Sequence, residues 1–113
     1  MRDNVQGGAL TETTLLVLLA FYKPNHGYGV MQFIKDKTNG RVDLGAGTLY
    51  GALNNLLKKG WIIQLSEEER KKEYIITDIG KEQVENEIKR LESIYGLARE
   101  TVKGGIRGDE ESF

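Results

Sequence analysis

The feature that most restricts the fold is a long, charged segment after residue 77 with an apolar stripe along it. Its apolar residues recur at alternating spacings of four and three: Val84, Ile88, Leu91, Tyr95, Ala98 and Val102. This spacing keeps one side of an α-helix apolar, as in a coiled coil. At about 1.5 Å per residue, the helix would be close to 40 Å long. One small domain cannot bury it, so we expect residues 78–103 to be a dimerisation helix, unless the helix folds back over the first helix of the chain.

The rest of the chain divides into short elements. At 113 residues there is room for one compact domain. Thr11 is a plausible N-cap for a buried first helix that stops at Lys23-Pro24. A turn at residues 25–27 leads to a second helix up to residues 38–40. A third helix spans residues 46–59, with Gly60 placed to end it.

Two predicted strands, residues 61–65 and 72–76, form a β-hairpin, and Thr77 caps the last helix. Three helices followed by a hairpin in this order predict a winged helix-turn-helix. The expected fold is therefore mainly α with a small β-hairpin. The winged helix-turn-helix domain spans residues 10–77 and is followed by the dimerisation helix at residues 78–103, and we expect flexible ends at residues 1–9 and 104–113.

The third helix has the surface expected of a helix that enters the major groove of DNA. At 100° per residue, Leu49, Leu53 and Leu56 define its inner face. Its outer face has no acidic and no large apolar residue, and the candidate DNA contacts there are Thr48, Asn54, Asn55 and Lys58. Tyr50 lies at the flank, where it can pack in the core, bind a phosphate, or do both. An ordinary solvated face is the alternative for the whole surface.

The hairpin has three consecutive cations, Arg70, Lys71 and Lys72, at the position where a wing meets the DNA backbone. They directly follow three glutamates, so an ordinary solvated charge run is the alternative. The net charge of the chain is only −1, with residues 1–63 at +3 and residues 64–113 at −4. Any basic binding face must therefore be local.

Several protein classes are excluded or lack the necessary residues. There is no cysteine and one histidine, His26, so a zinc site and a Cys or His nucleophile are not expected. The glycine pairs at 27–29 and 45–47 lack the third glycine of a nucleotide site. We expect no enzymatic activity and no cofactor. The longest apolar run, residues 15–22, is far shorter than the roughly 20 residues of a membrane span. These features predict a cytoplasmic protein that does not contact the membrane.

Three segments resemble the signature blocks of the PadR-like transcriptional regulators. They are HGYGVMQFI (26–34), GTLYGALNNLLKKGWI (47–62) and RKKEYIITDIGKE (70–82), in the matching order. The resemblance spans about residues 10–102. It implies a bacterial homodimeric repressor that binds an inverted-repeat operator in duplex DNA and is released by a small molecule or a stress signal.

By the same match, Tyr28, Thr48, Tyr50 and the wing cations would contact DNA. Gly51 and Glu73 depart from the proline and the aromatic residue that are frequent there, which affects contact details rather than the class. A winged-helix module that binds only other proteins is the alternative function.

Some members of this family bind flat aromatic compounds between the two subunits through a tryptophan of the last helix. The corresponding helix here has no tryptophan, and we expect the only one, Trp61, in the core. Leu15, Leu91 and Tyr95 are the candidate residues for contacting a small aromatic effector. We expect their surroundings to contain few polar groups and no inward-facing cation, which favours a flat apolar compound.

Overall fold

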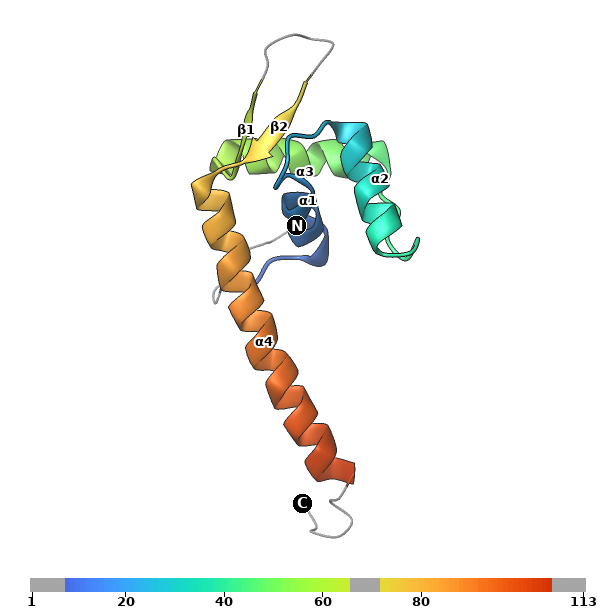
Figure 1. The fold of residues 1–113 in the computed structure, drawn as a ribbon, viewed down its shortest axis with the longest axis vertical. Helices are drawn as coiled ribbons and strands as arrows, with labels where there is room; N and C mark the ends of the chain where they lie inside the picture. Colours follow the sequence, from blue (N-terminus) through green and yellow to red (C-terminus); the bar gives the residue numbers. More distant parts are fainter. Residues whose placement is uncertain (1–7, 66–71, 107–113) are drawn as a thin grey trace.

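The computed structural model describes residues 8–65 and 72–106. Four helices and two strands follow in the order α1 (Glu12–Ala20), α2 (Gly27–Lys37), α3 (Ala46–Lys59), β1 (Ile62–Gln64), β2 (Tyr74–Ile76) and α4 (Asp78–Ile106). Figure 1 shows α1, α2, α3 and the hairpin gathered in one body, from which α4 runs away. The mainly helical fold with a hairpin and a long C-terminal helix is confirmed. In the described part of the chain, none of the helices is apolar over a length that could cross a membrane.

The core lies around α1. Val17, Leu18 and Phe21 have no exposed surface, and the inner face of α3 packs against them through leucines that are at most 1% exposed. The burial is not uniform around α1, because Leu19 is 36% exposed. This packing fixes α3 in the body and leaves its opposite face to solvent.

The predicted helix caps are confirmed. The backbone N–H of Thr14 donates to Oγ1 of Thr11 at 3.1 Å, which satisfies one free donor at the start of α1. Gly60 ends α3 in the left-handed region, at φ 76° and ψ 19°. Thr77 Oγ1 accepts a hydrogen bond from the N–H of Gly80 at 3.1 Å at the start of α4.

The first helix is shorter than expected, because α1 ends at Ala20 rather than at Lys23-Pro24. The residues that follow α1 form backbone hydrogen bonds with β2 instead of continuing the helix. The N–H of Ile76 donates to the carbonyl of Phe21 at 2.9 Å, and Asn25 and Tyr74 exchange two backbone hydrogen bonds of 3.1 and 2.9 Å. The strands are also shorter than expected, with the antiparallel register Ile62 to Ile76, Ile63 to Ile75 and Gln64 to Tyr74.

The first turns of α4 are bound to the body by a buried carboxylate. Glu87 is 2% exposed; its Oε1 accepts from the N–H of Leu10 at 3.3 Å, and Arg90 donates to both of its oxygens at 2.9 and 2.6 Å. These hydrogen bonds outweigh the effect of burial and lower the pKa of Glu87 below its usual range. The helix then continues to Ile106, past the expected end of the dimerisation segment at residue 103.

We expect Glu87→Ala to lower the free energy of unfolding at neutral pH by about 1–3 kcal/mol, because the buried N–H of Leu10 loses its partner. The folded pKa of this carboxyl lies below its ordinary value of 4.5. The stabilisation is therefore complete above that pH and is lost as the pH falls through the folded pKa. Urea unfolding at neutral and acidic pH measures both effects. Glu82→Ala, at an exposed site on the same helix, is the control, and equal losses for both variants would contradict the prediction.

Candidate nucleic-acid interface

The outer face of α3 is exposed as its periodicity predicts. Leu49, Leu53 and Leu56 are at most 1% exposed, whereas the polar and glycine positions on the other side are open to solvent: Gly47, Thr48, Gly51, Asn54, Asn55 and Lys58. The helix has no acidic residue, and Lys58 and Lys59 occupy its last turn. An uncharged polar face with cations at one end can approach a polyanion closely.

A groove of about 390 Å³ lies between this helix and the start of α1. Thr48 and Asn55 line it together with Thr13, Thr14, Gly47, Gly51 and Ala52. The expected base-reading residues Thr48 and Asn55 therefore share one side of α3, while Asn54 and Lys58 lie outside the groove. The threonines of α1 were missed by sequence reasoning, because only the tertiary packing brings them to α3.

Two candidate DNA-contacting tyrosines lie on neighbouring helices, Tyr28 at the start of α2 and Tyr50 on α3. Tyr28 is 63% exposed and Tyr50 is 51% exposed. The hydroxyl of Tyr50 lies so close to the start of α2 that a Cβ at Gly27 would come within 2.6 Å of it. Tyr50 is thus partly packed, with its polar end at a helix N-terminus, where free N–H groups and the helix dipole favour anions.

The start of α2 is capped by the single histidine. Nδ1 of His26 accepts a hydrogen bond from the N–H of Gly29 at 3.0 Å. This gives His26 a structural role at the turn before α2, as the sequence predicts. Within the described residues, no cluster of acidic or histidine side chains could hold a metal ion.

The hairpin rises from the same body (Figure 1). Lys72 is exposed and lies two residues before the first residue of β2. Arg70 and Lys71, the other two candidate wing cations, lie outside the described residues.

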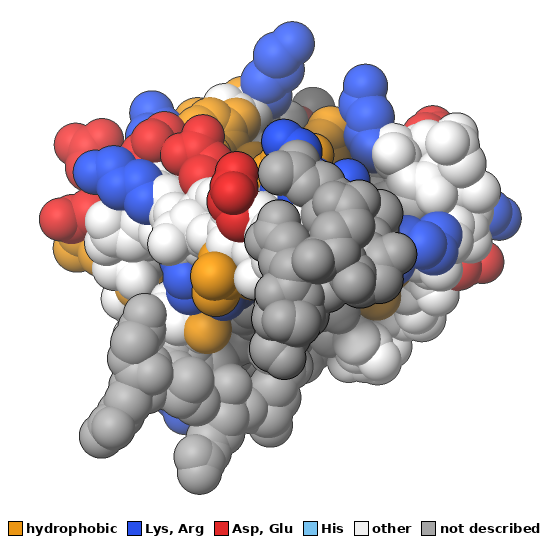
Figure 2. Space-filling view, turned by 90° about the horizontal axis from the view of Figure 1, so that it is seen from below, with side chains coloured by type: hydrophobic (Ala, Val, Ile, Leu, Met, Phe, Trp, Pro, Cys, Tyr) orange, Lys and Arg blue, Asp and Glu red, His pale blue; other side chains and the backbone are white. Residues whose placement is uncertain are grey.

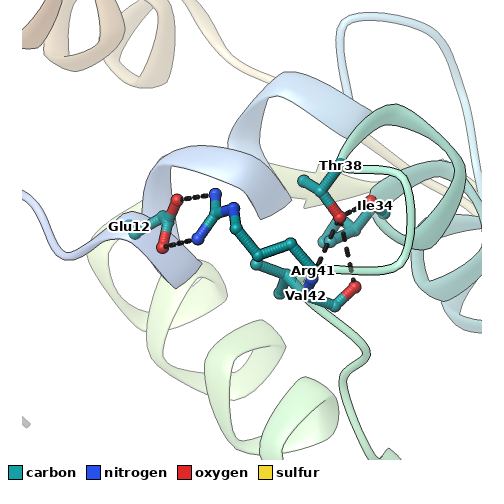
Figure 3. Close-up of polar contacts among 5 residues, drawn as sticks. All are labelled: Glu12, Ile34, Thr38, Arg41 and Val42. Carbon is teal, nitrogen blue, oxygen red and sulfur yellow. Dashed lines mark hydrogen bonds and ion pairs between the residues drawn. The ribbon is translucent and has the colours of Figure 1, made fainter.

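The loop between α2 and α3 is fixed by a side-chain brace that the sequence did not indicate (Figure 3). The guanidinium of Arg41 donates two hydrogen bonds to the carboxylate of Glu12, one of them at 3.2 Å. Thr38 Oγ1 donates to the carbonyl of Ile34 at 2.8 Å and accepts from the N–H of Val42 at 3.0 Å. The N-cap residue of α3, Gly45, makes no side-chain hydrogen bond. The pKa of Glu12 is lowered by the hydrogen bond from Arg41.

The apolar stripe of α4 changes its environment along the helix. Val84 is 1% exposed and packs in the core of its own chain, so it is not available to a partner. Beyond it, Ile88, Leu91, Tyr95 and Val102 are between 38% and 67% exposed, and Ala98 is exposed too. Figure 2, viewed from below, shows hydrophobic side chains exposed among acidic and basic ones. Ile94 and Leu97 are also exposed, at 50% and 64%, but they fall outside the four-three spacing and lie off the stripe.

The candidate effector residues are only partly brought together. Leu15 and Leu91 line a cavity of about 260 Å³ between α1 and α4, together with Leu10, Glu12, Glu87 and Arg90. Tyr95 does not line it. The expectation of a lining without cations was wrong, because the packing of α1 on α4 brings two ion-paired side chains, Glu87 and Arg90, to the edge of the cavity.

Comparison with known proteins identifies relatives. A family model described as the transcriptional regulator PadR-like family matches residues 15–86. An uncharacterised 37.1 kDa protein in transposon Tn4556 of Streptomyces fradiae is 33% identical over 91 residues, which are 80% of this chain and 26% of that protein. The chain therefore spans about a quarter of the length of that relative.

Solved structures share the fold. RosR from H. salinarum is 20% identical, with a TM-score of 0.65 over 92% of this chain and 96% of that chain. A transcriptional regulator from Clostridium thermocellum is 25% identical, with a TM-score of 0.66 over 77% of this chain and 85% of that chain.

Proposed function

The chain belongs to the PadR-like family of transcriptional regulators, and we propose that it is a homodimeric repressor that binds an inverted-repeat operator in duplex DNA. One observation carries the proposal: α3, which lies between α2 and the hairpin (Figure 1), has no acidic residue on its exposed face. α3 enters the major groove, with Thr48, Asn54 and Asn55 near base edges. Lys58, Tyr28, Tyr50 and the wing cations Arg70, Lys71 and Lys72 bind phosphates.

The dimer forms through the exposed part of the α4 stripe, from Ile88 to Val102. This stripe lies on the same helix face as Val84, which packs in the core. The packing of α4 against its own chain therefore covers only the start of the stripe. Several large apolar side chains remain exposed in a row, and a second copy of α4 buries them by a symmetric contact.

The experiment that tests this function is a selection of bound duplexes from a random DNA library, followed by binding assays over a range of salt concentrations. We expect an inverted-repeat consensus and an affinity that falls steeply with salt, because phosphate contacts release counterions. A protein-association module would select no sequence. The DNA upstream of the protein's own gene is the first natural duplex to assay, because the family resemblance implies autoregulation.

Release of the operator uses the cavity between α1 and α4. A flat apolar body fits over Leu15 and Leu91, and a polar group on the same compound can reach Arg90. To act, the compound must bind the DNA-free arrangement more tightly than the DNA-bound one.

We expect Leu15→Ala to raise the concentration of a releasing compound needed for half-maximal operator release by about tenfold, because Leu15 is partly buried and the loss of its apolar contact removes about 1–2 kcal/mol. Screening of aromatic compounds with an operator-release assay identifies the compound and measures the shift. Leu97→Ala, an exposed site outside the cavity lining, is the control. If the two variants need the same concentration of the compound for half-maximal operator release, the effector binds at another site.

A further inference from the structure

The end of α3 and the start of α4 meet in one compact junction, formed by Gly60, Trp61, Thr77 and Gly80. The hydroxyl of Thr77 donates to the carbonyl of Gly60 at 2.7 Å, and the N–H of Thr77 donates to the carbonyl of Trp61 at 2.9 Å. The same hydroxyl oxygen accepts the N–H of Gly80 at 3.1 Å. One side chain thus caps α4 and also binds the C-terminal end of α3.

Gly80 brings the two backbones into direct contact. It is buried, and a Cβ at this position would overlap the carbonyl oxygen of Trp61 and lie 2.7 Å from Cγ1 of Ile76. Glycine is therefore required for space. Any larger residue must push the first turn of α4 away from the end of α3.

The rest of α4 has few other constraints on its direction. Val84 and Glu87 hold its first turns to the body, whereas every side chain from residue 91 to 103 is exposed. Residues 91–106 form an arm of about 24 Å at 1.5 Å per residue. The junction itself lies about 40 Å from the end of α4 at 1.5 Å per residue, so a tilt of about 10° there moves that end by roughly 7 Å, about twice the 3.4 Å rise of one base pair.

We propose that Thr77 and Gly80 are positioning residues that set the angle between α3 and α4 and thereby the half-site spacing that the dimer reads. This inference rests on the proposed function, because it assumes that α4 joins the two chains and that α3 reads DNA. Two recognition helices can bind together only when their separation matches the separation of the half-sites along the duplex. If the junction in each chain holds α3 at a fixed angle to α4, the dimer holds its two recognition helices at a fixed separation.

The first test compares Thr77→Val with Thr77→Ser. Valine has a similar shape but lacks the hydroxyl, whereas serine keeps it. The affinity of each dimer is measured for the selected inverted repeat, for repeats with one base pair added or removed between the half-sites, and for an isolated half-site. We expect Thr77→Val and Gly80→Ala to reduce the preference for the native spacing by about tenfold, with half-site affinity unchanged, and Thr77→Ser to behave as the wild type.

The second test needs no DNA. Because the chain has no cysteine, Lys58→Cys and Glu100→Cys place two spin labels on α3 and α4, and dilution with unlabelled protein isolates the distance within one chain. We expect a narrow distance distribution that becomes broader or shifts in Thr77→Val and Gly80→Ala. If Gly80→Ala fails to fold, Thr77→Val alone decides the result.

Unchanged distance distributions in the variants would overturn the positioning role even if DNA binding is confirmed. An equal loss of affinity for every spacing and for the half-site would also overturn it, since that pattern reflects general destabilisation. Failure of the wild-type protein to bind DNA would refute the proposed function, while the distance measurement would still report on the junction.

Discussion

The double variant Ile88→Lys with Leu91→Lys will be a monomer and will bind the operator about 10²–10⁴-fold more weakly than the wild type. The two side chains are 38% and 41% exposed on the free chain, and their burial between two copies is lost when charges replace them. Each chain then binds one half-site without the gain in effective concentration that the joined chains provide. Added lysines can only increase attraction to DNA, so a weaker affinity reports the loss of the dimer.

Sedimentation velocity measures the association state, and fluorescence anisotropy with a labelled operator measures the affinity. Leu97→Lys is the matched control, because Leu97 is 64% exposed on α4 but lies off the stripe. A dimer that persists in the double variant would show that the chains associate through another surface. Monomers that bind the operator as tightly as the wild type would show that dimerisation is not needed for recognition.

We expect substitutions on α3 and on the wing to change DNA binding in different ways. We expect Thr48→Ala or Asn55→Ala to weaken operator binding by roughly 1–3 kcal/mol per residue and to leave binding to random DNA nearly unchanged, because these side chains read base edges. Arg70→Ala or Lys72→Ala should weaken binding to all sequences alike. Each of these losses of a lysine or arginine should make the negative slope of log K against log salt shallower by about one.

Binding titrations on operator and random duplexes at several salt concentrations separate the two classes. Lys35→Ala is a control cation, since Lys35 is exposed on α2 and faces Asp43 at 3.8 Å rather than the wing. If the α3 variants weaken random and operator DNA equally, α3 does not read sequence. If the wing variants leave the salt slope unchanged, the wing cations do not contact phosphates.

The sequence predicted those elements whose signals are local. Thr11, Gly60 and Thr77 were identified because caps depend on neighbours three or four residues away. The faces of α3 followed from the helical period alone. These local rules were enough to predict the order of elements and the exposed face of the candidate site.

Several of the features that were missed depend on residues far apart in the chain. α1 ends early because Phe21 and Asn25 bond to β2, about fifty residues later. Glu87 falls beside the apolar stripe in sequence, and only the position of Leu10 makes it a buried anchor. No periodicity or motif encodes such long-range partners, so a single sequence does not reveal them.

We expect two copies of this chain to read an inverted repeat together, each through α3 and its wing. A hydroxyl-radical footprint of the wild-type protein on the selected duplex is the decisive measurement. It should show two protected windows, related by a two-fold axis and centred on one face of the DNA a whole number of helical turns apart, at roughly 34 Å per turn. A single protected window, uniform protection along the duplex, or no protection at protein concentrations that saturate dimer formation would contradict it.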